Sequence, residues 1–269
     1  KDWPYLSVPW NTRIPGMRAM TTAIFVSLLL TLCGLASADK TITAAGVSVK
    51  VQGQSGKMTL TIPKQDNGTT DVECRMVALR QLDADGNKLG GGGSDKHSFE
   101  SFATQDFTIG TPTEGTYEGL NVSKVTFSST LVGSSELKIV TMIFQEGGSF
   151  KVGNDTVNVT AGTVKFNVEL GSWSWCGSDA VCKAAAGEGH SVELEISVET
   201  LGQGNPVSKS GKSAFDIGGG NELLMLDTYS TDGGSTWLTM PAGYPSVDGS
   251  KFTLKFPRWT GSVIYDPIV

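Results

Sequence analysis

The chain has 269 residues, of which 39% are apolar and 18% charged, and its formal net charge at pH 7 is −6. An acidic chain without clusters of basic residues is poorly suited to binding nucleic acid or anionic lipid. Thirty-four glycines beside a normal apolar fraction indicate a globular protein rich in turns, which excludes a disordered or collagen-like chain.

The N-terminal segment predicts export from the cell. Residues 1–16 contain no methionine and are interpreted as upstream sequence that is not part of the working protein. An apolar run over residues 23–35 is followed by Ala36-Ser37-Ala38, the small-residue pattern of a signal-peptidase site. We therefore expect a signal peptide over residues 17–38 and a secreted, extracellular protein over residues 39–269.

Alternating apolar and polar residues predict antiparallel strands with one buried and one solvated face. The alternating runs, in chain order, are residues 58–62, 164–170, 191–199 and 251–256. Segment 137–144 differs because its apolar residues point to both faces, which predicts a central strand covered on both sides.

Turn signals rich in Gly and Asp separate these runs at short intervals. They lie at residues 83–87, 90–93, 147–148, 218–220, 232–234 and 248–249. A single helical turn is expected within 180–186, and a long loop over 202–212. About twelve short strands without long helices predict an all-β fold, an antiparallel β-sandwich or jelly roll, as a single domain over 39–269. No apolar run of about 18 residues occurs after residue 38, so we expect no membrane span.

Three cysteines remain once Cys33 leaves with the signal peptide. Cys176 and Cys182 are close enough in sequence to form a disulfide around a small loop, worth roughly 2–2.5 kcal/mol in the loop-entropy model. Cys74 shares an apolar strand face with its second neighbours, so we interpret it as a buried small hydrophobe. Pairing of Cys74 with Cys176 or Cys182 is the alternative.

Four Asn-x-Ser/Thr sequons behind a signal peptide predict a glycoprotein. Their asparagines are Asn67, Asn121, Asn154 and Asn158. Asn158 alternates with two valines, so its side chain is expected to point away from the apolar face of its strand.

Three carboxylates, Glu193, Glu195 and Glu199, share one face of a predicted strand, with nearest neighbours roughly 7 Å apart. Glycoside hydrolysis uses such paired carboxylates. The stretch is similar to the E-x-D-x-E and E-x-D-x-x-E strand motifs of jelly-roll endoglucanases and laminarinases, and that resemblance would make Glu193 and Glu195 catalytic. It departs from them because Glu195 stands where an aspartate belongs and Glu199 lies too far along. The alternative, which we favour, is a solvated strand of an acidic protein without catalytic residues.

Two tryptophans, Trp173 and Trp175, lie two residues apart and would share one face at a strand end. Rings in such positions stack on the apolar faces of sugars, so the pair is a candidate ligand-binding platform. The alternative is that both rings close the end of the core. Further aromatic residues toward the C-terminus are Trp237, Tyr244, Trp259 and Tyr265.

Metal and cofactor motifs are missing from the sequence. His97 and His190 are the only histidines, and neither has a second ligand at zinc spacing. Segment 83–87 has oxygen ligands at alternate positions, as calcium loops do, but we favour a hairpin turn because no bidentate glutamate follows. No phosphate-binding loop or G-x-S-x-G motif occurs. We therefore predict no metal and no cofactor.

The C-terminal segment combines Met240–Pro245, Phe252–Phe256, Pro257-Arg258-Trp259 and Tyr265-Asp266-Pro267. With the signal peptide, strands and sequons, it resembles secreted proteins of marine invertebrates, notably cnidarians, some of which are recovered from skeletal organic matrix. The resemblance implies an extracellular structural or adhesive role. Strongly mineral-binding matrix proteins carry long Asp/Glu runs, and this chain has none, which argues against direct templating of carbonate.

The sequence therefore favours a secreted, glycosylated β-sandwich that acts without catalysis as an extracellular matrix or adhesion component, with a skeletal matrix as one such setting. The expected partner is an extracellular polysaccharide or a matrix protein. Two alternatives remain open: a lectin-like module that uses Trp173 and Trp175, and a jelly-roll glycoside hydrolase that uses Glu193 and Glu195. The oligomeric state is not predicted.

Overall fold

A computed structural model of the chain describes residues 38–64, 68–89, 98–99, 101–131, 135–153, 155–177, 188–201, 207–208, 214–218 and 221–268. These residues form 22 strands and no helix, so the predicted all-β class is confirmed. They all belong to one compact unit. The predicted helical turn at 180–186, most of the predicted signal peptide and most of the loop at 202–212 lie outside the described residues.

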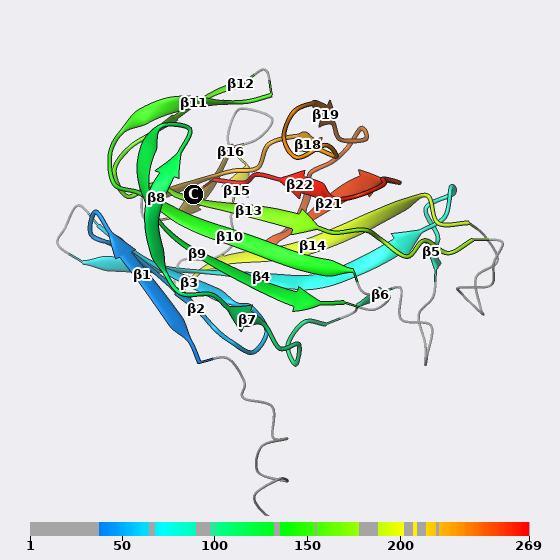
Figure 1. Cartoon of the computed structure of the whole chain (residues 1–269), viewed down its shortest axis with the longest axis horizontal. Coiled ribbons are helices and arrows are strands. Elements are labelled where there is room, and N and C mark those ends of the chain that lie inside the picture. The colour runs from blue at the N-terminus through cyan, green and yellow to red at the C-terminus, as the bar shows by residue number, and fades with distance from the viewer. Residues whose placement is uncertain are drawn as a thin grey trace, which may run out of the picture. The chain divides into compact units, whose positions relative to one another are not determined.

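Two large antiparallel sheets make up the sandwich, and Figure 1 shows β9, β10 and β13 of one sheet running across β4 and β14 of the other. The nine-stranded sheet contains β1 (Lys40–Ala44), β2 (Val47–Val51), β3 (Met58–Pro63), β4 (Thr69–Leu82), β14 (Ser191–Thr200), β21 (Lys251–Pro257) and β20 (Ser246–Asp248) in spatial order, with β5 (Lys88–Leu89) and β6 (Ser98–Phe99) paired to β4. The eight-stranded sheet contains β19 (Trp237–Thr239), β18 (Thr228–Ser230), β22 (Val263–Tyr265), β13 (Val164–Leu170), β10 (Glu136–Phe144), β9 (Leu120–Thr130) and β7 (Thr108–Ile109), with β8 (Thr113–Tyr117) paired to β9.

Two smaller sheets complete the described strands. One is the hairpin of β11 (Gly148–Val152) and β12 (Asp155–Val159), and the other joins β15 (Val207–Ser208), β16 (Ala214–Gly218) and β17 (Asn221–Leu224). The structure has more strands than the sequence predicts because many elements are only two to five residues long. Such short elements are too brief to show a period of two.

The main core lies between the two large sheets. The apolar alternates of β14, including Val192, Leu194 and Ile196, are fully buried against residues such as Phe166 of β13. All four alternating runs predicted from the sequence form strands, and their apolar residues belong to this core or pack against it. The polar alternates of β14 and β4 therefore point to the outer face of the nine-stranded sheet.

A second core covers the outer face of the eight-stranded sheet. Phe150, Val157 and other residues of the β11–β12 hairpin pack there against Met142 and Phe144 of β10. Strand β10 thus contributes alternate side chains to both cores, and the prediction of a central strand covered on both sides is confirmed.

Tight turns connect neighbouring antiparallel strands. Glu118 and Gly119, between β8 and β9, have positive φ values of 48° and 83°. A two-residue hairpin turn with positive φ at both positions matches the right-handed twist of the strands that it joins. The turn signals at 147–148, 232–234 and 248–249 likewise separate paired or adjacent strands. Among the described residues there is no helix that could cross a membrane.

Candidate functional site

The outer face of the nine-stranded sheet carries a lattice of paired charges. We call its members the charged face, and they are Lys57, Glu73, Arg75, Arg80, Glu193, Glu195, Glu199, Lys251 and Lys255. Five cations and four carboxylates give this face a formal charge of +1, whereas the whole chain carries −6. The charged face is therefore a balanced surface on an acidic protein.

A β-bulge brings Arg80 onto the charged face. Residues five apart on a regular strand point to opposite faces, so Arg75 and Arg80 would be separated by the sheet. In the register with β14, however, Glu195 lies opposite Ala78 and the next residue lies opposite Met76, so Val77 is an extra residue. The bulge reverses the alternation, and both arginines reach β14 from the same side.

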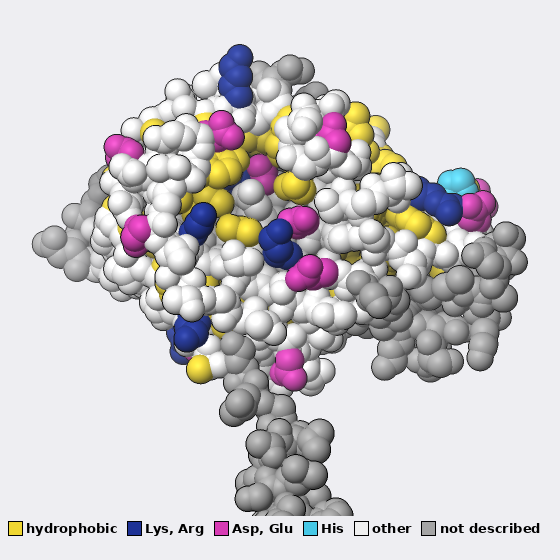
Figure 2. Space-filling model, viewed as in Figure 1, with side chains coloured by type: hydrophobic (Ala, Val, Ile, Leu, Met, Phe, Trp, Pro, Cys, Tyr) yellow, Lys and Arg dark blue, Asp and Glu magenta, His cyan; other side chains and the backbone are white. Residues whose placement is uncertain are grey.

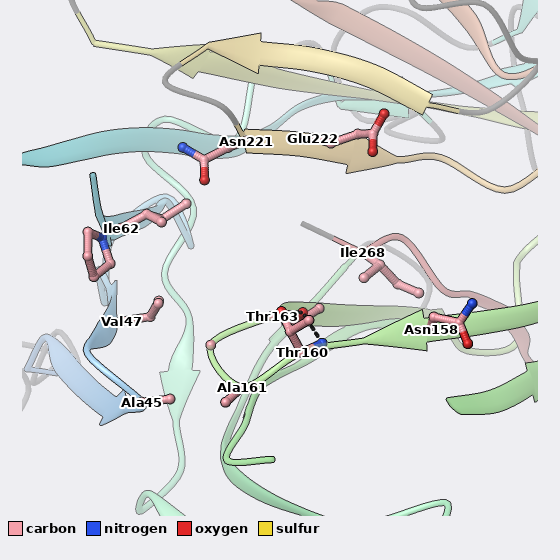
Figure 3. Close-up of a pocket in the computed structure, with 12 residues that line it drawn as sticks. Ala45, Val47, Ile62, Asn158, Thr160, Ala161, Thr163, Asn221, Glu222 and Ile268 are labelled. Atoms are coloured by element: carbon pink, nitrogen blue, oxygen red, sulfur yellow. Dashed lines mark hydrogen bonds between the residues drawn. The ribbon is translucent and has the colours of Figure 1, made fainter. Parts of the chain in front are cut away.

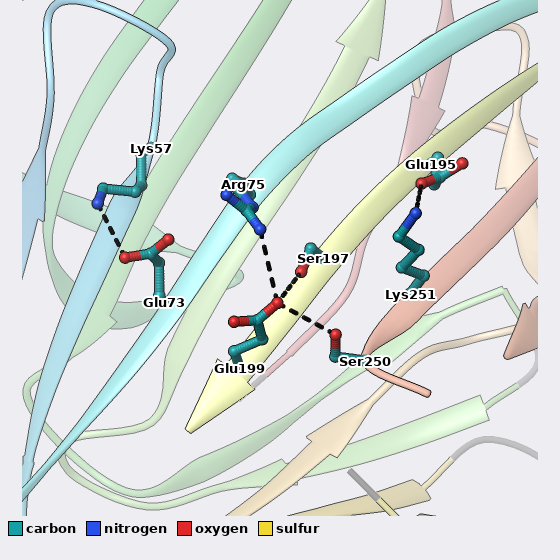
Figure 4. A network of polar contacts seen from close by, with 8 residues as sticks. All are labelled: Lys57, Glu73, Arg75, Glu195, Ser197, Glu199, Ser250 and Lys251. Atoms are coloured by element: carbon teal, nitrogen blue, oxygen red, sulfur yellow. Dashed lines mark hydrogen bonds and ion pairs between the residues drawn. The ribbon is translucent and has the colours of Figure 1, made fainter. Parts of the chain in front are cut away.

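Glu195 is the most buried carboxylate of the charged face. Its Oε2 accepts a hydrogen bond from Arg80 at 2.9 Å. Its Oε1 lies 3.0 Å from the Lys251 ammonium, and Figure 4 shows this ion pair. Burial alone would raise the pKa of Glu195, but the two cations hold this pKa below its ordinary value. Glu195 is therefore an ionised, doubly paired carboxylate at neutral pH.

Glu199 and Glu73 form the outer part of the same lattice. Glu199 accepts hydrogen bonds from the hydroxyls of Ser197 and Ser250 and lies 3.6 Å from Arg75 (Figure 4). Glu73 accepts a hydrogen bond from Lys57 at 2.8 Å. Each carboxylate drawn in Figure 4 thus has a cation beside it.

Glu193 has a tyrosine for its partner. The Tyr244 hydroxyl donates to Glu193 at 2.5 Å, and the Lys255 ammonium lies 5.5 Å from the centre of the Tyr244 ring. Lys255 is also the cross-strand neighbour of Glu193. Burial, and then the bond to Glu193, raise the pKa of Tyr244 to about 12. Tyr244 comes from the C-terminal segment, which therefore reaches the charged face.

A hollow of about 400 Å³ opens beside Glu199 on this face. Lys57, Arg75 and Lys251 line it together with one carboxylate, Glu73, so its formal lining charge is +2. Met76 and Phe102 also border it, but both side chains are buried in the main core. A hollow with surplus cations can hold an anionic group of a ligand.

The two predicted platform tryptophans have different environments. Trp173 is 8% exposed and belongs to the main core, with its ring 6.3 Å from that of Trp259. Trp175 is half-buried, donates its indole N–H to the Trp259 carbonyl, and has the Arg258 guanidinium 5.6 Å from its ring centre. Trp173 thus fills the core, and Trp175 is the member of the pair with accessible ring surface.

Two of the predicted glycosylation sites lie on described strands. Asn121 on β9 and Asn158 on β12 are exposed, and the valines beside Asn158 are buried, which confirms its predicted outward direction. Asn67 and Asn154 lie outside the described residues.

Asn158 also lines a separate pocket of about 500 Å³ (Figure 3). Val47 and Ile62 on one side face Thr163 and Ile268 across it, and Glu222 is its single ionisable lining side chain. One carboxylate among amides, hydroxyls and apolar groups is not an acid–base pair. The described lining of this pocket therefore supplies no pair of carboxylates for acid–base catalysis.

Cys74 is a free thiol buried in the main core, which confirms its interpretation as a small hydrophobe and excludes its pairing with another cysteine. Burial, with a smaller contribution from Glu73, raises the pKa of Cys74 to about 12. Cys176 is also buried, and its backbone N–H donates to Gln81 at 2.7 Å. The disulfide to Cys182 stays a prediction because Cys182 lies outside the described residues.

Segment 83–87 forms the turn between β4 and β5, as predicted. The Asp83 carboxylate accepts hydrogen bonds from the backbone of Asp85 and Asn87 and from the Asn87 side chain. These bonds lower the pKa of Asp83. The described residues contain no group of three or more His, Cys, Asp or Glu side chains placed to hold a metal ion.

The fold and the site define an all-β sandwich whose polar surface carries paired rather than clustered charge. On the face seen in Figure 2, acidic and basic side chains are likewise interspersed. The family model of acidic skeletal organic matrix proteins matches residues 34–212, and the chain belongs to this family. Membership indicates an extracellular matrix component and confirms the resemblance seen in the sequence. No solved structure matches the chain.

Sequence reasoning found three carboxylates of the charged face, Glu193, Glu195 and Glu199, but missed Glu73 and the cations. Lys251 and Lys255 were visible as the polar alternates of a strand, and no pattern placed them beside Glu195 and Glu193. Arg80 was hidden by the bulge, because its spacing from Arg75 indicates the opposite face. Tyr244 was named as an aromatic residue, but its bond to Glu193 spans 51 positions in the chain.

Proposed function

We propose that the protein is secreted and glycosylated and that it acts without catalysis as a binding component of the skeletal organic matrix. The observation that carries the proposal is the pairing of the candidate catalytic carboxylates. Glu193 is bonded to Tyr244, Glu195 to Arg80 and Lys251, and Glu199 lies beside Arg75.

Such pairing disfavours glycoside hydrolysis. The reaction needs one carboxyl that stays protonated near neutral pH and can deliver its proton to the leaving group, which requires a raised pKa. The pKa of Glu195 is lowered, which is wrong for this acid, and both of its oxygens face cations, which hinders its use as a nucleophile. The other candidate, Glu193, has its Oε1 bonded to the Tyr244 hydroxyl. A doubly paired carboxylate is a structural element of the sheet surface, because protonating it would break two ion pairs.

The hollow beside Glu199 is the proposed binding surface, and an anionic matrix polysaccharide is the proposed ligand. Lys57, Arg75 and Lys251 line this hollow and outnumber its single carboxylate, Glu73. Lys251 and Arg75 are about half exposed, so they can exchange an internal carboxylate for a carboxylate or sulfate of the ligand. Binding through exposed cations should weaken with added salt.

The test uses the secreted protein and a panel of neutral and anionic polysaccharides, with depletion from solution and released reducing ends recorded together. Depletion by anionic polysaccharides without release of ends supports the proposal. Lys251→Gln should reduce depletion, whereas Lys138→Gln should not, because Lys138 is an ion-paired lysine on the other large sheet and does not line the hollow. Release of reducing ends that disappears in Glu193→Gln would contradict the proposal in favour of a glycosidase.

A lectin mode through Trp175 makes a different prediction in the same assay. Its half-buried ring would stack on neutral sugars, so Trp175→Ala should abolish binding to neutral polysaccharides while Lys251→Gln leaves that binding unchanged. Loss of binding in Trp175→Ala alone would move the binding surface from the charged face to the tryptophan.

Secretion and glycosylation are tested on the protein recovered from the medium of eukaryotic cells. We expect its N-terminus at Asp39 and glycans on Asn121 and Asn158, whose side chains are exposed. Retention in the cells with an intact N-terminal segment would contradict the secretory part of the proposal.

A further inference from the structure

A fully buried lysine lies between an amide and a carboxylate on the outer face of β13. Lys165 has no exposed surface, and its Nζ lies 2.6 Å from Asn167 Oδ1 and 3.0 Å from Asp266 Oδ2. The Tyr117 ring covers the ammonium, with its centre 5.1 Å from Nζ. Lysine is almost never fully buried in proteins unless it is paired, so its burial here requires a specific explanation.

The contact with Lys165 uses only one carboxylate oxygen of Asp266, Oδ2. Its Oδ1 is buried and has no hydrogen-bond partner in the described part of the chain, while the Tyr117 hydroxyl lies 3.5 Å from Oδ2. The next residue, Pro267, accepts a hydrogen bond from the backbone N–H of Phe166, which fixes Asp266 beside β13. One carboxylate oxygen therefore holds the lysine, and the other can accept or pass on a proton.

The surroundings favour a neutral, nucleophilic amine. Tyr117 packs edge-on against Phe144 and Phe150 in the second core, so the lysine lies beside a cluster of aromatic rings. Burial lowers the pKa of Lys165, although the nearby Asp266 carboxylate opposes the shift. An amine held in an apolar site next to a carboxylate base is activated for attack on a carbonyl carbon.

We propose that Lys165 and Asn167 form an intramolecular amide bond between their side chains, with Asp266 as the proton carrier. Residues two apart on a strand share one face, and their Cβ atoms are about 7 Å apart. The four methylenes of the lysine cover that distance, and Nζ already touches the amide group of Asn167.

The atoms of the reaction balance without an external reagent. Lys165 gives one proton to Asp266, and its neutral Nζ attacks the side-chain Cγ of Asn167 to form the new Nζ–Cγ bond. The Cγ–Nδ2 bond then breaks, and Asp266 supplies the proton with which Nδ2 leaves as ammonia. After the attack, the nitrogen keeps one hydrogen and loses its second to Asp266. The net products are a secondary amide and an ammonium ion.

A neighbouring lysine provides a matched control. Lys138 of β10 lies on the same outer face and donates to Glu169 at 2.6 Å, but it is partly exposed and its contact is a carboxylate. It lacks the dry surroundings of Lys165, and the nearby Asn167 amide oxygen is bonded to Lys165. The proposed reaction is therefore specific to Lys165.

The test is a tryptic peptide map of the full chain produced in a bacterial host, where the sequons stay unglycosylated. Trypsin does not cleave after an acylated lysine, so we expect one peptide over residues 152–183 with a mass about 17 Da below its sequence mass, the loss of one ammonia. Fragmentation should place this loss between Lys165 and Asn167.

Three variants test the Lys165–Asn167 amide bond and the role of Asp266 separately. Lys165→Arg should be cleaved after residue 165 with no mass loss, Asp266→Asn should lower the linked fraction, and Lys138→Arg should leave it unchanged. Cleavage after Lys165 in the wild type with unmodified peptide masses would overturn the proposal, whether or not any variant folds. Loss of water with a link to the peptide containing Asp266 would also overturn it, because the acyl partner would then be the aspartate.

Discussion

Replacing Glu195 with glutamine separates a structural role of this residue from a catalytic one. The substitution keeps the shape of the side chain but removes the charge that faces Arg80 and Lys251. Hydrogen bonds to charged groups contribute about 1.5–3 kcal/mol, and water recovers part of this loss because both cations are partly exposed. We therefore expect Glu195→Gln to lower the free energy of unfolding by about 1–2 kcal/mol.

Glu199→Gln is the matched control on the same strand. The Glu199 side chain is 42% exposed against 10% for Glu195, so its loss should cost less than about 1 kcal/mol. The pH dependence adds a second readout. Because the cations lower the folded pKa of Glu195 from its ordinary 4.5, the stabilisation is complete above pH 4.5 and is lost as the pH falls through the folded pKa.

The assay is urea denaturation of the wild type and both variants at several pH values. The difference between wild type and Glu195→Gln should be largest at neutral pH and should shrink below pH 4.5. A variant as stable as the wild type at neutral pH, or a difference that persists unchanged at roughly pH 3, would refute the assignment of a paired, ionised Glu195.

Three further predictions concern the core and the turns. Cys74, whose pKa is raised to about 12, should resist alkylation in the native protein and react only after unfolding, as mass spectrometry would show; rapid native labelling would contradict its burial. Trp259→Ala should lower the free energy of unfolding by about 3–5 kcal/mol in denaturant titrations, and a near-neutral effect would remove this ring from the core. Gly56→Ala should cost roughly 1–3 kcal/mol, because the new Cβ would stand 2.7 Å from the Phe107 ring. Gly86 also has a positive φ but has open space around it, so Gly86→Ala should cost less. Equal losses of unfolding free energy in the two variants would show that the backbone conformation, and not the contact with Phe107, sets the cost.

The fold could be predicted from the sequence to the level of an all-β sandwich because alternation is a local property. Each of the long runs, such as residues 164–170, shows its buried face without reference to any other strand. The pairing of the strands could not be predicted in the same way. Strand β14 lies between β4 and β21, and neither neighbour adjoins it in the chain. The family match covers residues 34–212, whereas the C-terminal segment quoted for the resemblance lies after residue 239. The sequons quoted with that segment, such as Asn121 and Asn158, lie within the match.

The candidate site was predicted only in part, for the same physical reason. The alternation in β14 shows that Glu193, Glu195 and Glu199 share a face, but their chemistry depends on side chains from other strands. Arg80 reaches Glu195 across 115 positions of the chain and only because of a bulge. A lysine in an alternating strand such as Lys165 is predicted to be solvated, and its burial depends on the second core, which no local pattern indicates.

Because β10 is buried on both faces, this strand separates the main core from the second core. Neighbouring residues such as Met142 and Ile143 belong to different cores although one peptide bond joins them. Loosening of the β11–β12 hairpin would let water reach Met142 while the environment of Ile143 stayed intact. Adjacent positions of a single strand therefore report on local unfolding of two different cores. Isotopic probes on the methyl groups of Met142 and Ile143 would record the order in which the two cores unfold.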